Sequence, residues 1–129
     1  MHTVVIIEDN DVVRMTLRAL LRHAGYQVVG EAGRGESGIE LVRSRRPDVV
    51  CLDVQLPGMN GVHVLRELRT HWPTLPVVIV SGYTDRETVT ELIECGADAV
   101  VVKPFTEARL VDAIRRAMNA RRVATVRGR

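Results

Sequence analysis

The chain has 129 residues, a length typical of one domain with its own buried core. Hydrophobic residues make up 46% and charged residues 26%, which favours a folded globular protein over a disordered chain. No apolar stretch approaches the roughly 20 residues that span a bilayer, and the first residues do not resemble a secretory leader. Cys51 and Cys95 lack metal-site spacing, so we expect two reduced thiols and a cytoplasmic protein.

The net charge of +2 is unevenly distributed along the chain. Six arginines and no acid follow Ala113. Removing them from the 18 basic residues leaves 12 against 16 acidic ones, a net charge of −4 for residues 1–112. We therefore expect an acidic domain over residues 1–119 and a basic tail or linker over 120–129. Nucleic-acid binding by the domain itself is not expected.

Short apolar runs alternate with helical patterns along the chain. Strands are predicted over residues 4–7, 27–29, 49–52, 77–80 and 100–102, because these runs are short and rich in β-branched residues. Helices are predicted between and after them, over residues 13–24, 36–46, 62–72, 84–96 and 106–119. This alternation, with right-handed crossovers, predicts a three-layer α/β/α sandwich around a five-stranded parallel sheet. If the strand order is 2-1-3-4-5, as in flavodoxin-like folds, the switch point lies between the first and third strands.

Several helix boundaries have recognisable signals. Gly25 and Gly96 stand where helices end. Thr84 and Thr106 stand where the fourth and fifth helices would begin, each as a cap. Gly38 weakens the helical pattern of 36–46, which is the least convincing of the five. Residues beyond about 119 are expected to extend the last helix or to fray.

Four of the predicted strands end on a residue with a reactive side chain. Glu8 and Asp9 follow the first strand, and Asp53, Ser81 and Lys103 follow the third, fourth and fifth. Because the carboxyl ends of parallel strands lie at one edge of a sheet, these groups are predicted to meet in one crevice. Hard oxygen ligands of this kind suit Mg²⁺ and a phosphoryl group. Zinc is not expected, since there is no CxxC or HxxxH motif.

The order and spacing of these residues resemble the signature of response-regulator receiver domains (CheY-like), the phospho-acceptor modules of two-component signalling. The resemblance extends over residues 3–119 and rests on Glu8-Asp9, Asp53, Leu56-Pro57-Gly58-Met59-Asn60-Gly61, Ser81-Gly82 and Lys103-Pro104-Phe105. It implies a CheY-like fold, Mg²⁺ as cofactor, and a sensor histidine kinase or histidine phosphotransfer protein as partner. It implies no enzymatic activity beyond the domain's own phosphorylation and dephosphorylation.

The resemblance also implies a role for each site residue. Asp53 would be the nucleophile that becomes phosphorylated. Asp9, Asp53 and the backbone carbonyl of Gln55 would bind Mg²⁺, with Glu8 acting through water. Lys103 would pair with a phosphoryl oxygen, or with Asp53 when no phosphoryl group is present. Ser81 would donate a hydrogen bond to the phosphoryl group and move towards it. The peptide bond between Lys103 and Pro104 would be cis.

The chain departs from the family pattern at one switch position. Receivers usually carry Tyr or Phe three residues before the lysine, whereas this chain has Val100. An aromatic readout therefore cannot operate as usual. In the family, residues matching Gln55 and Tyr83 tune the access of water to the phosphoaspartate. A bulky Tyr83 predicts slower self-dephosphorylation.

The output of the domain is open at the level of sequence. A homodimer through the face of the fourth helix (84–96), fifth strand (100–102) and fifth helix (106–119) is one expectation. Another is a docking partner, for a stand-alone receiver, or an effector domain missing from this chain. No helix-turn-helix or catalytic domain follows residue 119.

Two other functions compete with the receiver interpretation. Asp9-Asn10-Asp11 resembles the nucleophile motif of haloacid-dehalogenase-type Mg²⁺-dependent phosphatases, in which Asp9 would be phosphorylated. The chain, however, lacks the acidic pair expected after the lysine. The arginine-rich tail 120–129 is compatible with nucleic-acid binding, but it contains no aromatic residue for base stacking.

Overall fold

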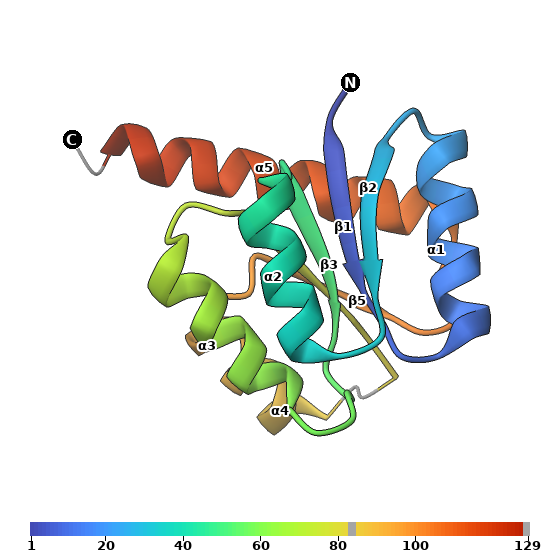
Figure 1. Ribbon diagram of the computed structural model, residues 1–129. Coiled ribbons are helices and arrows are strands. Elements are labelled where there is room, and N and C mark those ends of the chain that lie inside the picture. Colours follow the sequence, from blue (N-terminus) through green and yellow to red (C-terminus); the bar gives the residue numbers. More distant parts are fainter. Residues whose placement is uncertain (83–84, 128–129) are drawn as a thin grey trace.

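The chain folds around one parallel sheet. The computed structural model describes residues 1–82 and 85–127, apart from the side chains of 122–127. Strands β1 (Thr3–Ile7), β2 (Gln27–Ala32), β3 (Val49–Asp53), β4 (Val77–Ser81) and β5 (Ala99–Val102) have the order β2-β1-β3-β4-β5 (Figure 1). The helices are α1 (Asp11–His23), α2 (Gly35–Arg45), α3 (Gly61–His71), α4 (Arg86–Glu94) and α5 (Glu107–Arg127). The predicted fold and strand order are confirmed.

Helices cover both faces of the sheet, so the strands are buried on two sides. Strand residues such as Val5 and Ile7 pack with α2, α3 and α4, whereas their neighbours Val4 and Ile6 pack with α1 and α5. The central strands β1, β3 and β4 have almost fully buried side chains, as expected for parallel strands between two helical layers. The result is the predicted three-layer sandwich, and its β1–β3 boundary is the point where the strand order reverses.

Most predicted helix boundaries are confirmed, and one is corrected. Asn10 caps α1, its Oδ1 accepting a hydrogen bond from the Val13 amide at 3.0 Å. Thr106 begins α5 as expected, its Oγ1 accepting from the Arg109 amide. The cap of α4 is Asp85 rather than Thr84, since Asp85 Oδ2 accepts from the Thr88 amide at 2.9 Å. Thr84 itself lies outside the described residues.

Strand β2 is longer than the apolar run that predicted it. It continues to Ala32, three residues beyond the expected end, because its pairing with β1 extends to Ile7↔Ala32. The Glu8 amide then donates to the Ala32 carbonyl at 2.9 Å. Glu31 falls within this extension, where its carboxylate is paired with arginines of α1. A charged residue in an edge strand interrupts the apolar pattern without interrupting the ladder.

Close packing explains why helix α2 contains glycines that weaken its pattern. A Cβ atom on Gly38 would lie 2.6 Å from the Ile7 side chain, and one on Gly35 would lie 2.7 Å from Val64. These glycines let α2 approach the sheet and α3. At the other end of the chain, α5 continues unbroken through residue 127, across the domain boundary predicted near residue 119 (Figure 1).

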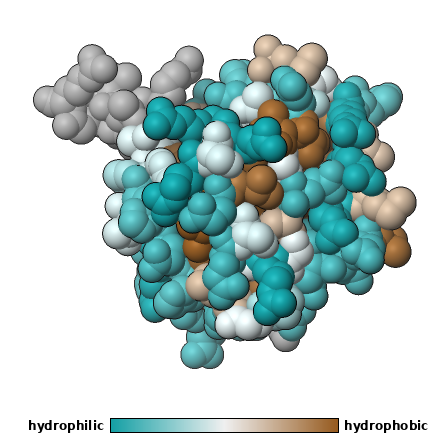
Figure 2. All heavy atoms as spheres, in the orientation of Figure 1, coloured by the Kyte–Doolittle hydropathy of each residue, from teal (hydrophilic) through white to brown (hydrophobic). Residues whose placement is uncertain are grey.

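The surface on the side of α2 and α3 is mostly hydrophilic. Figure 2 shows this face with small, separate hydrophobic areas rather than one broad patch, the usual pattern for a face that covers a core. No helix among residues 1–82 and 85–127 is long and apolar enough to cross a membrane.

Candidate functional site

The carboxyl edge of the sheet gathers the three acidic residues that the sequence singled out. Glu8 and Asp9 follow β1, and Asp53 is the last residue of β3, the neighbouring strand. Each of the three offers a carboxylate oxygen, and these oxygens all lie within 4.8 Å of one another. Glu8 and Asp53 are buried, whereas Asp9 is exposed. The predicted acidic crevice is therefore present, with one side open to solvent.

Lys103 is the counter-charge of this cluster. Its Nζ lies 2.9 Å from Glu8 Oε1 and 3.6 Å from Asp53 Oδ1. Burial raises the pKa of the Glu8 carboxyl above its ordinary value of 4.5. The nearby Asp53 carboxyl raises this pKa further, while the ammonium of Lys103 and the hydrogen bond from the Asn10 amide lower it. One ammonium facing three carboxylates leaves the site short of positive charge.

The loop after Asp53 is held in a tight conformation. The Gln55 amide donates to Asp53 Oδ1 at 3.2 Å, and the Gly61 amide donates to the Val54 carbonyl at 2.8 Å. A Cβ atom on Gly61 would lie 2.4 Å from Val54 Cα, so no larger residue fits there without a backbone shift. A cavity of about 530 Å³ lies beside this loop, lined by Asp9, Val54, Gln55, Leu56, Pro57 and Asn60. Asp9 and Gln55 therefore face the same space.

Ser81 and Lys103 end the two adjacent strands on the other side of Asp53. Ser81 is buried at the end of β4, and its carbonyl accepts a hydrogen bond from the Lys103 amide at 2.8 Å. The Lys103–Pro104 peptide bond is cis, as predicted. Val100 is half-buried and packs against the core on the side of α2, α3 and α4. Tyr83, the expected modulating residue, lies outside the described residues.

The sequence reading missed an arginine that supports the acidic loop. Arg14, on α1, donates from Nη1 to the main-chain carbonyl of Glu8 at 2.9 Å and from Nη2 to Asp11 Oδ1. Its Nε lies 3.6 Å from Glu31 on β2, which also pairs with Arg18. The spacing of Asp11 and Arg14 on one helix was a readable signal, but the contact with the Glu8 carbonyl depends on the folded loop.

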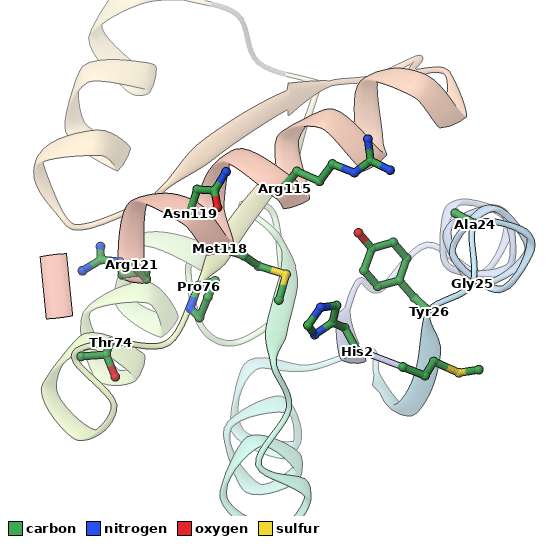
Figure 3. A pocket seen from close by; sticks show the side chains of 11 residues that line it. His2, Ala24, Gly25, Tyr26, Thr74, Pro76, Arg115, Met118, Asn119 and Arg121 are labelled. Carbon is green, nitrogen blue, oxygen red and sulfur yellow. The ribbon is translucent and has the colours of Figure 1, made fainter. Parts of the chain in front are cut away.

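A second cavity lies at the opposite edge of the sheet, away from these carboxylates. It has a volume of about 880 Å³ and is bounded by the start of β1, the α1–β2 turn and α5. Figure 3 shows His2, Tyr26 and Met118 pointing towards one another, with Arg115 on α5 above them. No group of three or more metal-ligating side chains occurs there among the described residues. Asp9 lines the cavity of about 530 Å³ at the carboxyl edge instead.

The fold and the site together define a class: a doubly wound α/β protein with an acidic, lysine-bearing site at its topological switch point. The sequence model described as "Response regulator receiver domain" matches residues 4–115. The chain belongs to this family, the receiver domains of two-component response regulators.

Relatives and solved structures agree with this assignment. The chain is 36% identical over 118 residues to protein CcdB of Bacillus subtilis, covering 92% of this chain and 98% of that protein. It is 36% identical over 122 residues to the transcriptional regulatory protein PdtaR of Mycobacterium tuberculosis, covering 95% of this chain but 59% of that protein. The crystal structure of a putative response regulator from Chloroflexus aurantiacus matches with a TM-score of 0.86 and 32% identity, over 92% of this chain and 98% of the other.

Proposed function

We propose that this receiver domain accepts a phosphoryl group from a phosphohistidine onto Asp53. The observation that carries the proposal is the surroundings of Asp53, a buried carboxylate among two other carboxylates and one ammonium. In the transfer, a carboxylate oxygen of Asp53 forms a bond to phosphorus while the bond from phosphorus to the imidazole nitrogen breaks. The electron pair of that bond stays on the imidazole of the sensor histidine kinase or histidine phosphotransfer protein.

The donor set fits Mg²⁺. Glu8 Oε1 is buried and accepts no hydrogen bond of standard geometry from the described residues, although Lys103 Nζ lies 2.9 Å away. The cluster combines three carboxylates with one cation, and all its ligand atoms are hard oxygens. Asp9, Asp53 and the Gln55 carbonyl would hold Mg²⁺, with Glu8 acting through water. When bound, the ion offsets negative charge on the phosphoryl oxygens.

Lys103 and Ser81 are proposed to read the phosphorylated state. Lys103 Nζ, now shared between Glu8 and Asp53, can pair with a phosphoryl oxygen on Asp53 without crossing the site. Ser81 ends the strand next to β3 and would donate its hydroxyl to the same group. Its displacement would carry the signal towards the face of α4, β5 and α5. Val100 takes no part as an aromatic switch, and Gln55 and Tyr83 are proposed to set the lifetime of the phosphoaspartate.

The signal would reach a second molecule or domain through that face. A homodimer, a docking partner and an effector domain continuing from α5 all remain proposals for the output. Residues 1–119 would be the receiver domain and 120–129 a basic tail or linker. We propose a cytoplasmic protein whose chemistry is limited to its own phosphorylation and dephosphorylation. Cys51 and Cys95 are both free thiols, which supports a reducing compartment.

Intact-mass analysis tests the phosphorylation directly. The protein is incubated with Mg²⁺ and a small phosphodonor such as phosphoramidate, and we expect the mass of one phosphoryl group to be added. The Asp53→Asn variant should take up none, whereas Asp112→Asn, which changes an exposed acid paired with Arg116 on α5, should behave as wild type. Phosphate uptake by Asp53→Asn contradicts the proposal, and a phosphoryl group mapped to Asp9 would indicate phosphatase-type chemistry instead.

The proposed role of Tyr83 has its own test. The half-life of the phosphorylated protein is measured by the same mass analysis after the donor is removed. We expect the Tyr83→Ala variant to lose its phosphoryl group faster than wild type, because a smaller side chain admits water more easily. An unchanged half-life would exclude this role.

A further inference from the structure

We propose that Arg14 is a positioning residue that holds the Glu8–Asp9 segment in the geometry needed for Mg²⁺. This inference rests on the proposed function of the acidic site. Arg14 lies on α1, which packs beside β1 and β2 (Figure 1). Its side chain is 23% exposed, so most of it is removed from water. It is not one of the three metal-binding candidates.

The guanidinium of Arg14 joins three separate segments around the acidic loop. Nη1 donates to the main-chain oxygen of Glu8 at 2.9 Å, Nη2 to the side chain of Asp11, and Nε faces Glu31 at 3.6 Å. A flat guanidinium group with several fixed donors suits such a junction better than a single ammonium. Through it, the residue just after β1 is tied to the first turn of α1 and to the last part of β2.

Asp9 depends on its backbone for its position. Among the described residues its carboxylate has no hydrogen bond or ion pair, and its side chain is exposed. The segment around it is fixed at its main-chain atoms: the Glu8 amide donates to the Ala32 carbonyl, and the Glu8 carbonyl accepts from Arg14. The Asn10 amide donates to Glu8 Oε2 at 3.2 Å. Removal of the Arg14 bond would free the peptide that links Glu8 to Asp9.

Gly33 packs against both Arg14 and the Glu8–Asp9 segment. A Cβ atom on Gly33 would lie 3.7 Å from Arg14 Nη1 and 3.8 Å from Asp9 Cα. Gly33 is therefore in contact with both the Arg14 guanidinium and the loop that Arg14 holds. Partners that orient metal ligands in this way commonly change metal affinity by roughly 10- to 100-fold when mutated. An effect of that size is expected at Arg14.

Arg18 provides a matched control on the same helix. Its Nη1 pairs with Glu31 at 2.9 Å, so Arg18→Met and Arg14→Met each remove one positive charge and one partner of Glu31. Of these two arginines, Arg14 is the one that contacts the Glu8 carbonyl. A difference in Mg²⁺ affinity between the two variants would therefore be due to the contact with the loop and not to the loss of one positive charge.

The experiment measures Mg²⁺ affinity by isothermal titration calorimetry on the full chain, with thermal unfolding as a check of folding. We expect Arg14→Met to weaken Mg²⁺ binding roughly 10- to 100-fold, and Arg18→Met to change it less than about threefold. Arg14→Lys keeps the charge but loses the three-way junction, so it should recover only part of the affinity. Equal affinities for the two methionine variants, or full recovery by Arg14→Lys, would overturn the proposal.

Amide hydrogen exchange separates this inference from the proposed function. Arg14→Met should speed exchange at the Glu8 and Asn10 amides, and Arg18→Met should not. If wild type binds no Mg²⁺ but the two variants differ in exchange, Arg14 holds the loop and the proposed Mg²⁺ site is wrong. If wild type binds Mg²⁺ but the two variants have the same exchange and affinity, the Mg²⁺ site is supported and the positioning role of Arg14 is wrong.

Discussion

Replacing Asp98 with alanine should destabilise the fold more than any exposed acidic substitution. Asp98 lies between α4 and β5, with its side chain 5% exposed. Its Oδ2 accepts from Arg69 Nη2 at 2.7 Å and from the Val77 amide at 2.9 Å. Its Oδ1 accepts from Arg121 Nε at 2.6 Å. One buried carboxylate therefore connects α3, β4 and α5.

The loss of unfolding free energy in Asp98→Ala depends on the arginines that the substitution leaves without a carboxylate partner. Removing one member of a buried ion pair costs about 3–5 kcal/mol, because the other charge stays buried without compensation. Arg69 is 14% exposed in its side chain and already has its pKa lowered to about 10, chiefly by burial. It keeps hydrogen bonds to the Gly96 and Leu75 carbonyls, and Arg121 is 22% exposed. We therefore expect the lower part of that range, about 3 kcal/mol.

Urea denaturation followed by far-ultraviolet circular dichroism measures this loss. With a slope of about 2 kcal/mol per molar urea, the Asp98→Ala midpoint should fall by about 1.5 M. Asp48→Ala is the control: Asp48 also accepts two hydrogen bonds, both from Thr3, but its side chain is 46% exposed. It should lose about 1 kcal/mol. Equal losses for the two variants would refute the reasoning, since burial would then make no difference.

Three further predictions concern the core and the acidic site. Burial raises the pKa of Cys51 from 9.0 to about 12. As the pH rises, the thiol therefore loses its proton in the unfolded chain before it does so in the folded one. Relative to Cys51→Ala, the free energy of unfolding of wild type should fall by about 1.4 kcal/mol per pH unit between pH 9 and 12. Parallel pH profiles of the two proteins would contradict this. Lys103→Met should lower the unfolding free energy in the absence of Mg²⁺ by about 1–2 kcal/mol, and saturating Mg²⁺ should restore it; no response to Mg²⁺ would count against the charge argument. Gly61→Ala should cost about 2–3 kcal/mol and abolish phosphoryl uptake, because its Cβ would lie 2.4 Å from Val54 Cα; wild-type stability in thermal unfolding would exclude this.

Periodicity and strand ends were sufficient to predict the alternating strands and helices and the members of the acidic site, whereas the strand order followed from the resemblance to a known fold. Apolar β-branched runs are buried in a parallel sheet whatever their neighbours, so the strands around Val50 or Ile79 were readable. Strand β2 was less readable, because Glu31 interrupts its apolar pattern and is neutralised only by arginines of another element. The cap at Asp85 was missed because Thr84 matched a capping motif equally well. Local patterns identify elements, but choices between adjacent residues depend on the folded loop.

The supporting contacts of the site were beyond sequence reasoning for a related reason. Arg14 and Asp98 act on main-chain groups or on side chains far along the chain, such as the Glu8 carbonyl or Arg121. The spacing of residues in the sequence cannot show that a loop will turn a main-chain carbonyl towards a side chain of a helix. The reactive side chains were found because chemistry restricts their type; the residues that hold them were not, because many side chains could hold a loop.

The contacts of Arg69 and Arg121 with Asp98 lie at one edge of the sheet, and those of Arg14 lie at the opposite edge. The first set fixes the end of α5, and the second fixes the loop after β1. At the amino edge, Asp98 joins Arg69 and Arg121, so the contacts of α5 with the body of the domain continue to residue 121, six residues beyond the family match. At the carboxyl edge, Arg14 donates to the Glu8 carbonyl of a loop whose next carboxylate, Asp9, is exposed. Lys103 shares this edge, and its ammonium pairs with the carboxylates of Glu8 and Asp53, which a proposed cation or phosphoryl group would reorganise. A change at the acidic site would therefore act on Lys103 and its strand, while the anchor at Asp98 keeps the far end of α5 in place.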